Sequence, residues 1–96
     1  MVAAITGCTS QQVSPNLASK IIEVVTPATA DSADTLDVSS ATVTGGQVLA
    51  TIYGVIGVFD TTTGDAVTGT WSGTTITIDA SGSTTNHVYR VVVYGI

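Results

Sequence analysis

Short segments whose apolar residues alternate between two faces constrain this chain more than any other feature. Residues 20–26 alternate in this way, and Pro27 ends the segment because proline cannot donate to a strand ladder. Turn residues recur every ~8–12 positions, and no long apolar stripe of helical period occurs. This pattern predicts an all-β domain, an antiparallel sandwich or small barrel of about six to seven short strands, with less than about a tenth of the chain in helix. Further strands are expected at residues 34–39, 48–59, 67–71, 75–79 and 87–94.

The longest apolar run, residues 48–59, is apolar on both faces of the expected strand. Alternation places Ile52 and Ile56 on one face and Tyr53 and Phe59 on the other. Such a strand is either central and covered, or it has its outer face against a partner. Residues 60–65 then form a hairpin loop in which Gly64 can adopt a positive φ.

The same alternation predicts the residues of the hydrophobic core. The expected core consists of Ile22, Val24, Leu36, Val38, Ile52, Ile56, Val67, Trp71, Ile76, Ile78, Val91 and Val93. Tight turns are expected at Gly45-Gly46 and at Ser72-Gly73, and residues 80–85 form a polar loop.

The N-terminal residues 1–18 lack clear periodicity, so we expect an irregular arm with one short strand at its start, followed by a single β domain at 19–96. The arm either reaches a neighbouring subunit or folds back on its own sheet. Ile5-Thr6-Gly7-Cys8 resembles a bacterial lipobox. It lacks a basic region and the apolar stretch of about 7–15 residues that precedes one, which predicts an uncleaved cytosolic product.

The composition of the chain points to an assembly. Only 9% of its residues are charged, against about a quarter in an average soluble domain. The chain contains 18 Thr and 14 Val, and such β-branched residues are enriched in strands. Lys20 and Arg90 are the only basic residues, so few lysines can guard sheet edges against pairing. The net charge of −5 and the absence of a basic cluster argue against nucleic-acid binding. No apolar run approaches the ~20 residues of a membrane span.

His87 and Cys8 are the two side chains most suited to catalysis or metal binding. A catalytic histidine needs a nucleophile and an orienting acid, and no sequence feature links Cys8 to His87. One histidine and one cysteine would also need carboxylates to complete a transition-metal site, and no ligand spacing suggests one. A satisfied or surface histidine is the expectation.

The aspartates are the alternative candidates, because calcium takes clustered oxygen ligands from loops. Asp31, Asp34 and Asp37 recur every third residue. Asp60 and Asp65 flank the hairpin turn. Neither stretch follows an EF-hand or nonapeptide pattern, and Asp34 and Asp37 point to opposite faces if residues 34–38 form a strand. Solvated turn carboxylates are the default interpretation.

Four aromatic residues could form a carbohydrate platform: Tyr53, Trp71, Tyr89 and Tyr94. Trp71 shares its face with Val67, which favours core packing instead. Gly45-Gly46 is interpreted as a turn, since it lacks the lysine and the helix start of a phosphate-binding loop. The sequence therefore assigns no catalytic, cofactor-binding or metal-binding residue and predicts a protein that is not an enzyme.

Residues 53–95 carry the run Y-G-V-I-G-V-F-D-T-T-T-G-D-A-V and end in V-Y-R-V-V-V-Y-G. This style resembles the small all-β virion proteins of tailed bacteriophages and related viruses, of the decoration, cement or minor capsid type. The resemblance implies a homo-oligomeric virion protein without catalytic activity, made in the host cytoplasm, that binds a major capsid or other virion protein. The net negative charge and the lack of a basic arm fit a position on the outside of the virion better than one that faces the genome.

Two other classes remain open at this point. A secreted or surface filament subunit would complete a neighbour's sheet with its N-terminal strand. A carbohydrate-binding module would be favoured by two aromatic rings that are exposed and coplanar.

Overall fold

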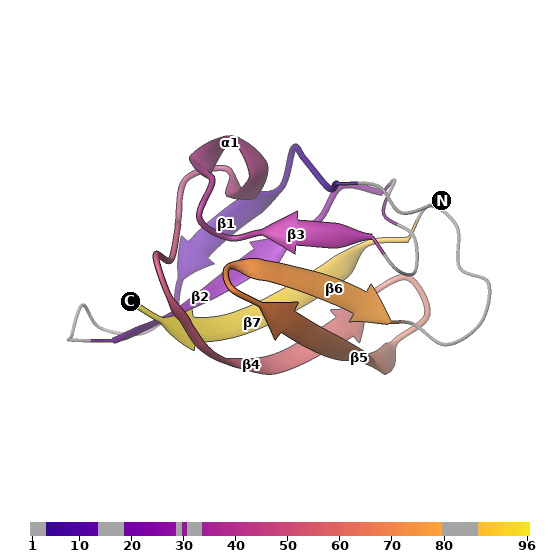
Figure 1. Ribbon diagram of the computed structural model, residues 1–96. Helices are drawn as coiled ribbons and strands as arrows, with labels where there is room; N and C mark the ends of the chain where they lie inside the picture. Colours follow the sequence, from indigo (N-terminus) through magenta and orange to yellow (C-terminus); the bar gives the residue numbers. More distant parts are fainter. Residues whose placement is uncertain (1–3, 14–18, 29, 31–33, 80–86) are drawn as a thin grey trace.

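The computed structural model describes residues 4–13, 19–28, 30, 34–79 and 87–96. Within these residues, seven strands form one sheet in the order β1-β2-β7-β4-β5-β6-β3, and adjacent strands are antiparallel (Figure 1). This confirms the all-β antiparallel fold. The elements are β1 (Thr9–Gln12), β2 (Lys20–Val25), β3 (Thr35–Asp37), the short helix α1 (Ala41–Thr44), β4 (Ile52–Asp60), β5 (Asp65–Ser72), β6 (Thr75–Asp79) and β7 (Tyr89–Gly95).

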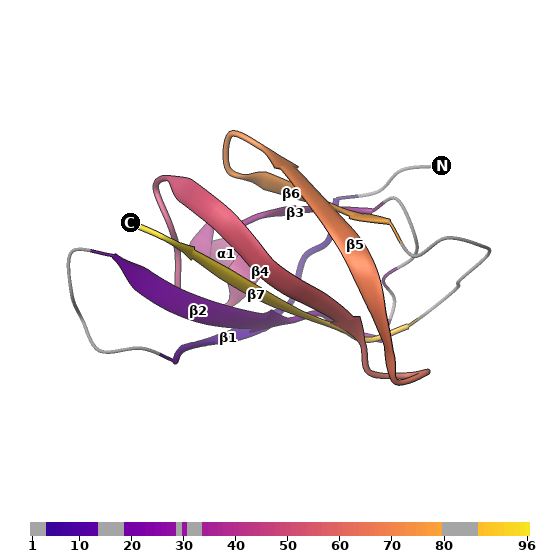
Figure 2. The ribbon, with the colours of Figure 1, turned by 90° about the horizontal axis from the view of Figure 1, so that it is seen from below.

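The sheet curls into a half-barrel with two layers (Figures 1 and 2). We call β5, β6 and β3 the front layer, and β1, β2, β7 and β4 the back layer. β5 joins the two layers. Its first residues, 65–67, pair with β4 in the back layer, and its remaining residues, 68–72, pair with β6 in the front layer. Gly69 permits the close crossing, since a Cβ there would lie 2.5 Å from Val58 Cγ2.

The hydrophobic core fills the space between the two layers. Most of the expected core residues are confirmed as buried: Ile22, Val24, Leu36, Val38, Ile52, Ile76, Ile78, Val91 and Val93. Val67 is partly buried and packs against this core. The expected core did not include the buried Ile5, Cys8, Ala30, Leu49, Val58 and Tyr89.

The N-terminal segment contributes a strand and core residues to the fold. β1 pairs with β2, and Ile5 and Cys8 are buried among the core side chains. Ile5 N donates to Thr35 O at 2.8 Å, which ties the segment to β3. The strand thus lies at residues 9–12 and not at the start of the segment, where it was expected. Its side chains, T-S-Q-Q, are all polar, so no apolar alternation marks it.

The assignment of Ile56 to the core is wrong, because this side chain is 55% exposed. The ladder between β4 and β7 shifts register between Ile52 and Gly54 and again between Val55 and Gly57. Each β-bulge adds a residue to one strand and interrupts strict alternation. The inward positions of β4 are consequently Ile52, Val55 and Val58, three residues apart, and Ile56 points outward.

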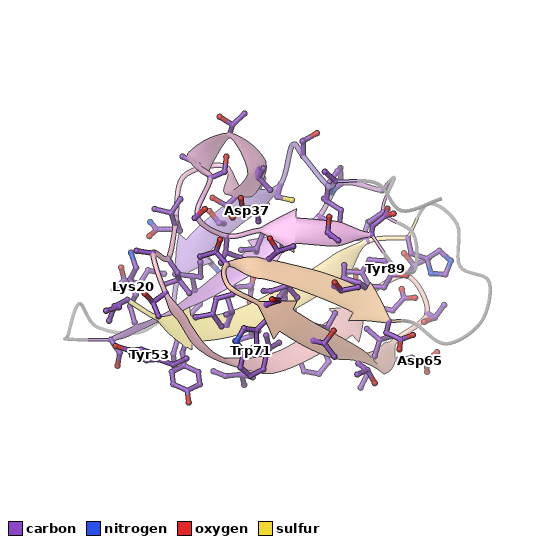
Figure 3. All side chains as sticks on the ribbon, viewed as in Figure 1. Lys20, Asp37, Tyr53, Asp65, Trp71 and Tyr89 are labelled. Carbon is purple, nitrogen blue, oxygen red and sulfur yellow. The ribbon has the colours of Figure 1, made fainter. Side chains whose placement is uncertain are left out.

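The assignment of Trp71 to the core is also wrong, because its side chain is 45% exposed. The register places Trp71 opposite the buried Ile76. The β4–β5 ladder has ended at Val67 by then, and the indole lies at the lower margin of the two layers, as Tyr53 does (Figure 3). Strand alternation gives the side of the sheet but not the extent of the opposite layer, so it could not detect this margin.

The expected turns are present where the structure describes them. Gly64 has φ 83° and its N–H donates to Asp60 O at 2.7 Å, which closes the β4–β5 hairpin. Gly73 has φ 62° in the tight turn between β5 and β6. Gly45 ends α1 in the left-handed conformation with φ 82°. The expected loop at 80–85, and Asp31, lie outside the described residues.

Candidate functional site

The outer side of the back layer is apolar across β2, β7 and β4. We call this surface the apolar face, and it consists of Ile21, Val25, Tyr53, Ile56, Phe59, Val92 and Tyr94. The β4 side chains are the most exposed of this face, with Tyr53 48%, Ile56 55% and Phe59 42% exposed. An antiparallel sheet that faces water normally carries polar residues on that side. A contiguous exposed apolar surface therefore indicates an interaction site.

The outer side of the front layer has the opposite character. It is formed by Thr35, Asp37, Thr68, Thr70, Ser72, Thr75, Thr77 and Asp79. The register aligns Thr70 with Thr77 and Thr77 with Thr35 in a row across three strands. The front layer thus presents a polar surface suited to water, and the back layer presents an apolar surface suited to a partner.

Two glycines of β4 let aromatic rings lie on the apolar face. A Cβ at Gly54 would be 2.6 Å from Cε1 of Tyr94, and a Cβ at Gly57 would be 2.7 Å from Cζ of Phe59. No other side chain could occupy these positions without displacing the rings. The glycines therefore keep Tyr94 and Phe59 close to the sheet. We use the name ridge for the three exposed side chains Tyr53, Ile56 and Phe59, which follow one another along β4.

A shallow hollow lies on the same outer side of the back layer, on β1 and β2. It has a volume of about 260 Å³ and is lined by Thr9, Ser10, Gln11, Glu23 and Val25. Gln11 Nε2 donates to Glu23 Oε1 at 3.3 Å, and Arg90 Nε lies 3.6 Å from the same oxygen. Since Arg90 is on β7, this ion pair lies between the hollow and the ridge.

Asp60 and His87 form a polar cluster in which the Asp60 carboxylate accepts three hydrogen bonds. His87 Nδ1 donates to Asp60 Oδ2 at 2.6 Å. The other carboxylate oxygen of Asp60 accepts from the backbone N–H groups of Thr62 at 3.0 Å and Thr63 at 3.2 Å. Asp60 is 2% exposed, and a buried carboxylate is costly unless it is paired and hydrogen-bonded. These donors compensate its charge. Burial acts to raise the pKa of Asp60, but the hydrogen bonds from His87, Thr63 and Thr62 outweigh it and hold the pKa below its ordinary value.

The geometry of this pair favours a structural role. A histidine oriented by a buried carboxylate is part of a catalytic triad only when a nucleophile faces its other nitrogen. Two threonine hydroxyls of the hairpin are instead engaged with Val88, the residue that precedes β7. Thr61 Oγ1 donates to Val88 O at 3.1 Å, and Val88 N donates to Thr62 Oγ1 at 3.0 Å. Together these contacts attach the β4–β5 hairpin to the residues that precede β7.

The other candidate side chains are dispersed. Cys8 is buried in the core, and burial raises the pKa of its thiol to about 11. Asp37 accepts hydrogen bonds from the neighbouring Ser39 and from Thr74 in the turn between β5 and β6, and those from Ser39 chiefly lower its pKa. Asp34 is buried on the opposite side of β3. Within the part of the chain that the structure describes, no group of three or more metal-ligating side chains occurs.

The four aromatic candidates do not form a platform. Tyr89 is fully buried. The rings of Tyr53 and Tyr94 are exposed, with centroids 6.1 Å apart, but their planes meet at 70°. A sugar ring needs a flat surface, so this pair does not meet the criterion of exposed, coplanar rings.

Sequence reasoning missed two features of the structure. The Asp60–His87 contact joins residues 27 positions apart, and only the D-T-T-T-G turn pattern marked Asp60 as a turn acceptor. The ridge was hidden by the two bulges of β4, although the glycines at 54 and 57 were a usable signal, since glycine within a strand often marks a bulge.

Comparison with family models, with curated proteins and with solved structures found no match. Among the described residues, no helix is both long and apolar enough to cross a membrane.

Proposed function

We propose that this chain is a non-enzymatic structural protein of a virion, a capsid decoration, cement or minor capsid protein that assembles through apolar sheet contacts. The observation that carries the proposal is the apolar face, whose residues Tyr53, Ile56, Phe59 and Tyr94 are each 39% to 55% exposed. Interaction surfaces of assemblies are enriched in such aromatic and aliphatic residues and depleted of charge. The assignment to virions rests on the resemblance of residues 53–95 to small phage structural proteins.

The distribution of charge supports a structural role. Among the described strand residues, Glu23 and Arg90 are the charged side chains on the same outer side as the apolar face, and they form an ion pair. The exposed acids Asp65 and Asp79 lie on the β4–β5 hairpin and on the front layer. A partner can therefore cover the apolar face without burying an unpaired charge, which would be costly.

The Asp60–His87 cluster supports the same conclusion. Its hydrogen bonds run to the backbone of the hairpin that joins the two layers. These contacts stabilise the corner of the sheet from which β5 departs. We therefore assign the cluster to folding and not to catalysis.

The test is the protein content of purified virions from cells that produce this chain. Mass spectrometry should find it at a fixed number of copies per particle, and cryo-electron microscopy should place it on the outer surface. Ile56→Lys should be lost from particles, whereas Thr70→Lys, on the polar front layer, should be retained. The absence of the chain from virions would overturn the proposal.

A further inference from the structure

The sheet has an open edge on β4, and we propose that the two β-bulges of this strand keep the edge from pairing with a second copy of the chain. β4 pairs with β7 along one side over its whole length. On its other side, β4 pairs with β5 only from Val58 to Asp60. Among the described residues, the backbone of residues 52–57 therefore has no ladder partner on this side. The inference concerns the edge of β4 and not the apolar face, so it does not depend on the proposed function.

β5 leaves the edge of β4 because it crosses to the inner side of that strand. A Cβ at Gly69 would lie 2.5 Å from Val58 Cγ2 and 3.4 Å from Val55 Cγ1, and both valines belong to the core side of β4. Figure 2 shows the two strands meeting at their hairpin and separating from there. β5 thus packs on the inner face of β4 and no longer hydrogen-bonds to its edge.

The open stretch of β4 carries no chemical protection against pairing. Its sequence is I-Y-G-V-I-G, without a charged residue or a proline. An open row of backbone donors and acceptors is a template for another strand, and sheet proteins blunt such edges with charges, prolines, short strands, bulges or a covering loop. Of these means, the bulge is the one that β4 has in this stretch.

The two end strands of the sheet are protected in another way. β1 has four residues and β3 has three, so each offers only a short edge. Backbone from other segments also contacts them. Gln47 N donates to Ser10 Oγ of β1 at 2.9 Å, and Ile5 N donates to Thr35 O of β3 at 2.8 Å. The longest open stretch is therefore that of β4.

Both bulges lie within this open stretch. The two register shifts leave Tyr53 and Ile56 without a partner on β7. The part of β4 that pairs with β5, residues 58–60, has a regular register with β7. A bulge bends its strand and increases the local twist, which turns the edge away from a second strand. The bulges thus occur where the edge is open and are absent where β5 covers it.

The core does not require either bulge. Without Ile56, the pairs of Val55, Gly57 and Val58 with β7 would follow one another in strict alternation, and both valines would stay on the core side. Removal of Tyr53 would regularise the other bulge in the same way. A regular β4 would therefore keep its buried side chains, but it would present a straight and uncharged edge.

Deletion of Ile56 tests the protection of the edge, and Ile56→Ser is the matched control. Both variants lose the exposed isoleucine, but only the deletion removes a bulge. Two straight β4 edges can pair antiparallel about a two-fold axis, which closes at a dimer. In sedimentation velocity, the deletion should raise the dimer association constant at least tenfold above that of the unmodified chain, and Ile56→Ser should not raise it. Equal association of the two variants would overturn the proposal.

A lysine added to the deletion variant locates the contact. Tyr53→Lys places a charge beside the open edge of β4, so it should lower the association constant at least tenfold. Thr70→Lys places the same charge on β5, at a level where β5 pairs only with β6, and it should leave the constant unchanged. The opposite result would assign the contact to β5 and refute the role of β4.

Circular dichroism and urea unfolding establish which variants are folded. If the chain without Ile56 does not fold, deletion of Tyr53 removes the other bulge and should give the same rise in association. If neither deletion variant folds, the bulges are needed for the fold itself, and the proposal that they protect the edge is refuted.

Discussion

Replacement of Asp60 by alanine is the sharpest test of how the two layers are joined. The substitution removes three hydrogen bonds, from His87 Nδ1 and from the backbone N–H groups of Thr62 and Thr63. A hydrogen bond to a charged group contributes about 1.5–3 kcal/mol. The three contributions do not add, because water can reach the exposed threonines and the partly exposed imidazole. We expect a loss of about 2–3 kcal/mol in the free energy of unfolding.

Asp65 provides the matched control, because it lies opposite Asp60 in the same hairpin and is exposed. Asp65→Ala should change the free energy of unfolding by no more than about 0.5 kcal/mol. Urea unfolding at pH 7, followed by circular dichroism, measures both variants. If Asp60→Ala is no less stable than Asp65→Ala, the cluster does not anchor the hairpin and our reasoning is refuted.

The pH dependence of the same comparison tests the charge of Asp60. Its pKa in the folded protein lies below its ordinary value, so the unfolded chain binds this proton more readily. The stabilisation should be complete above about pH 4, the ordinary range of an aspartate, and should be lost as the pH falls through the folded-state pKa. The difference between the unmodified protein and Asp60→Ala should therefore shrink in acid. A difference that grows in acid would contradict this sign.

Three further outcomes follow from the packing. Ile78→Ala should lower the free energy of unfolding in urea by about 2–5 kcal/mol, because Ile78 is fully buried. Ile56→Ala should change it by less than about 0.5 kcal/mol, because Ile56 is exposed. Equal effects of the two substitutions would contradict the bulged register of β4. Gly69→Ala should cost about 1–3 kcal/mol, because its Cβ would lie 2.5 Å from Val58 Cγ2, and an unchanged unfolding midpoint would show that the layers do not cross closely there. Deletion of residues 1–12 should lower the unfolding temperature, since it removes β1 together with buried residues, and an unaffected temperature would return this segment to the role of a dispensable arm.

The sequence by itself determined the class of the fold and most of its interior. Alternation is a local property, so a few neighbouring residues suffice to assign the inner face of a strand. The inner face was assigned in this way for β2, with Ile22 and Val24, and for β6, with Ile76 and Ile78. Pro27, Gly64 and the glycine pair at 45–46 likewise act through their own backbone geometry, and they mark the ends and turns correctly. These features depend on the residues themselves and on little else.

Only the tertiary structure decided which surface is apolar and what lies on it. The outward position of Ile56 depends on two bulges, which arise where β4 is matched against β7 and which no property of β4 alone specifies. The exposure of Trp71 depends on where β5 leaves β4, and the contact between Asp60 and His87 depends on a hairpin folding against a strand that begins far along the chain. Pairing between distant segments sets register and coverage, whereas local sequence sets only the tendency to form strands. The ridge, the hollow and the ion pair between them come from β1, β2, β4 and β7, which span most of the chain, so their arrangement exists only in the folded sheet.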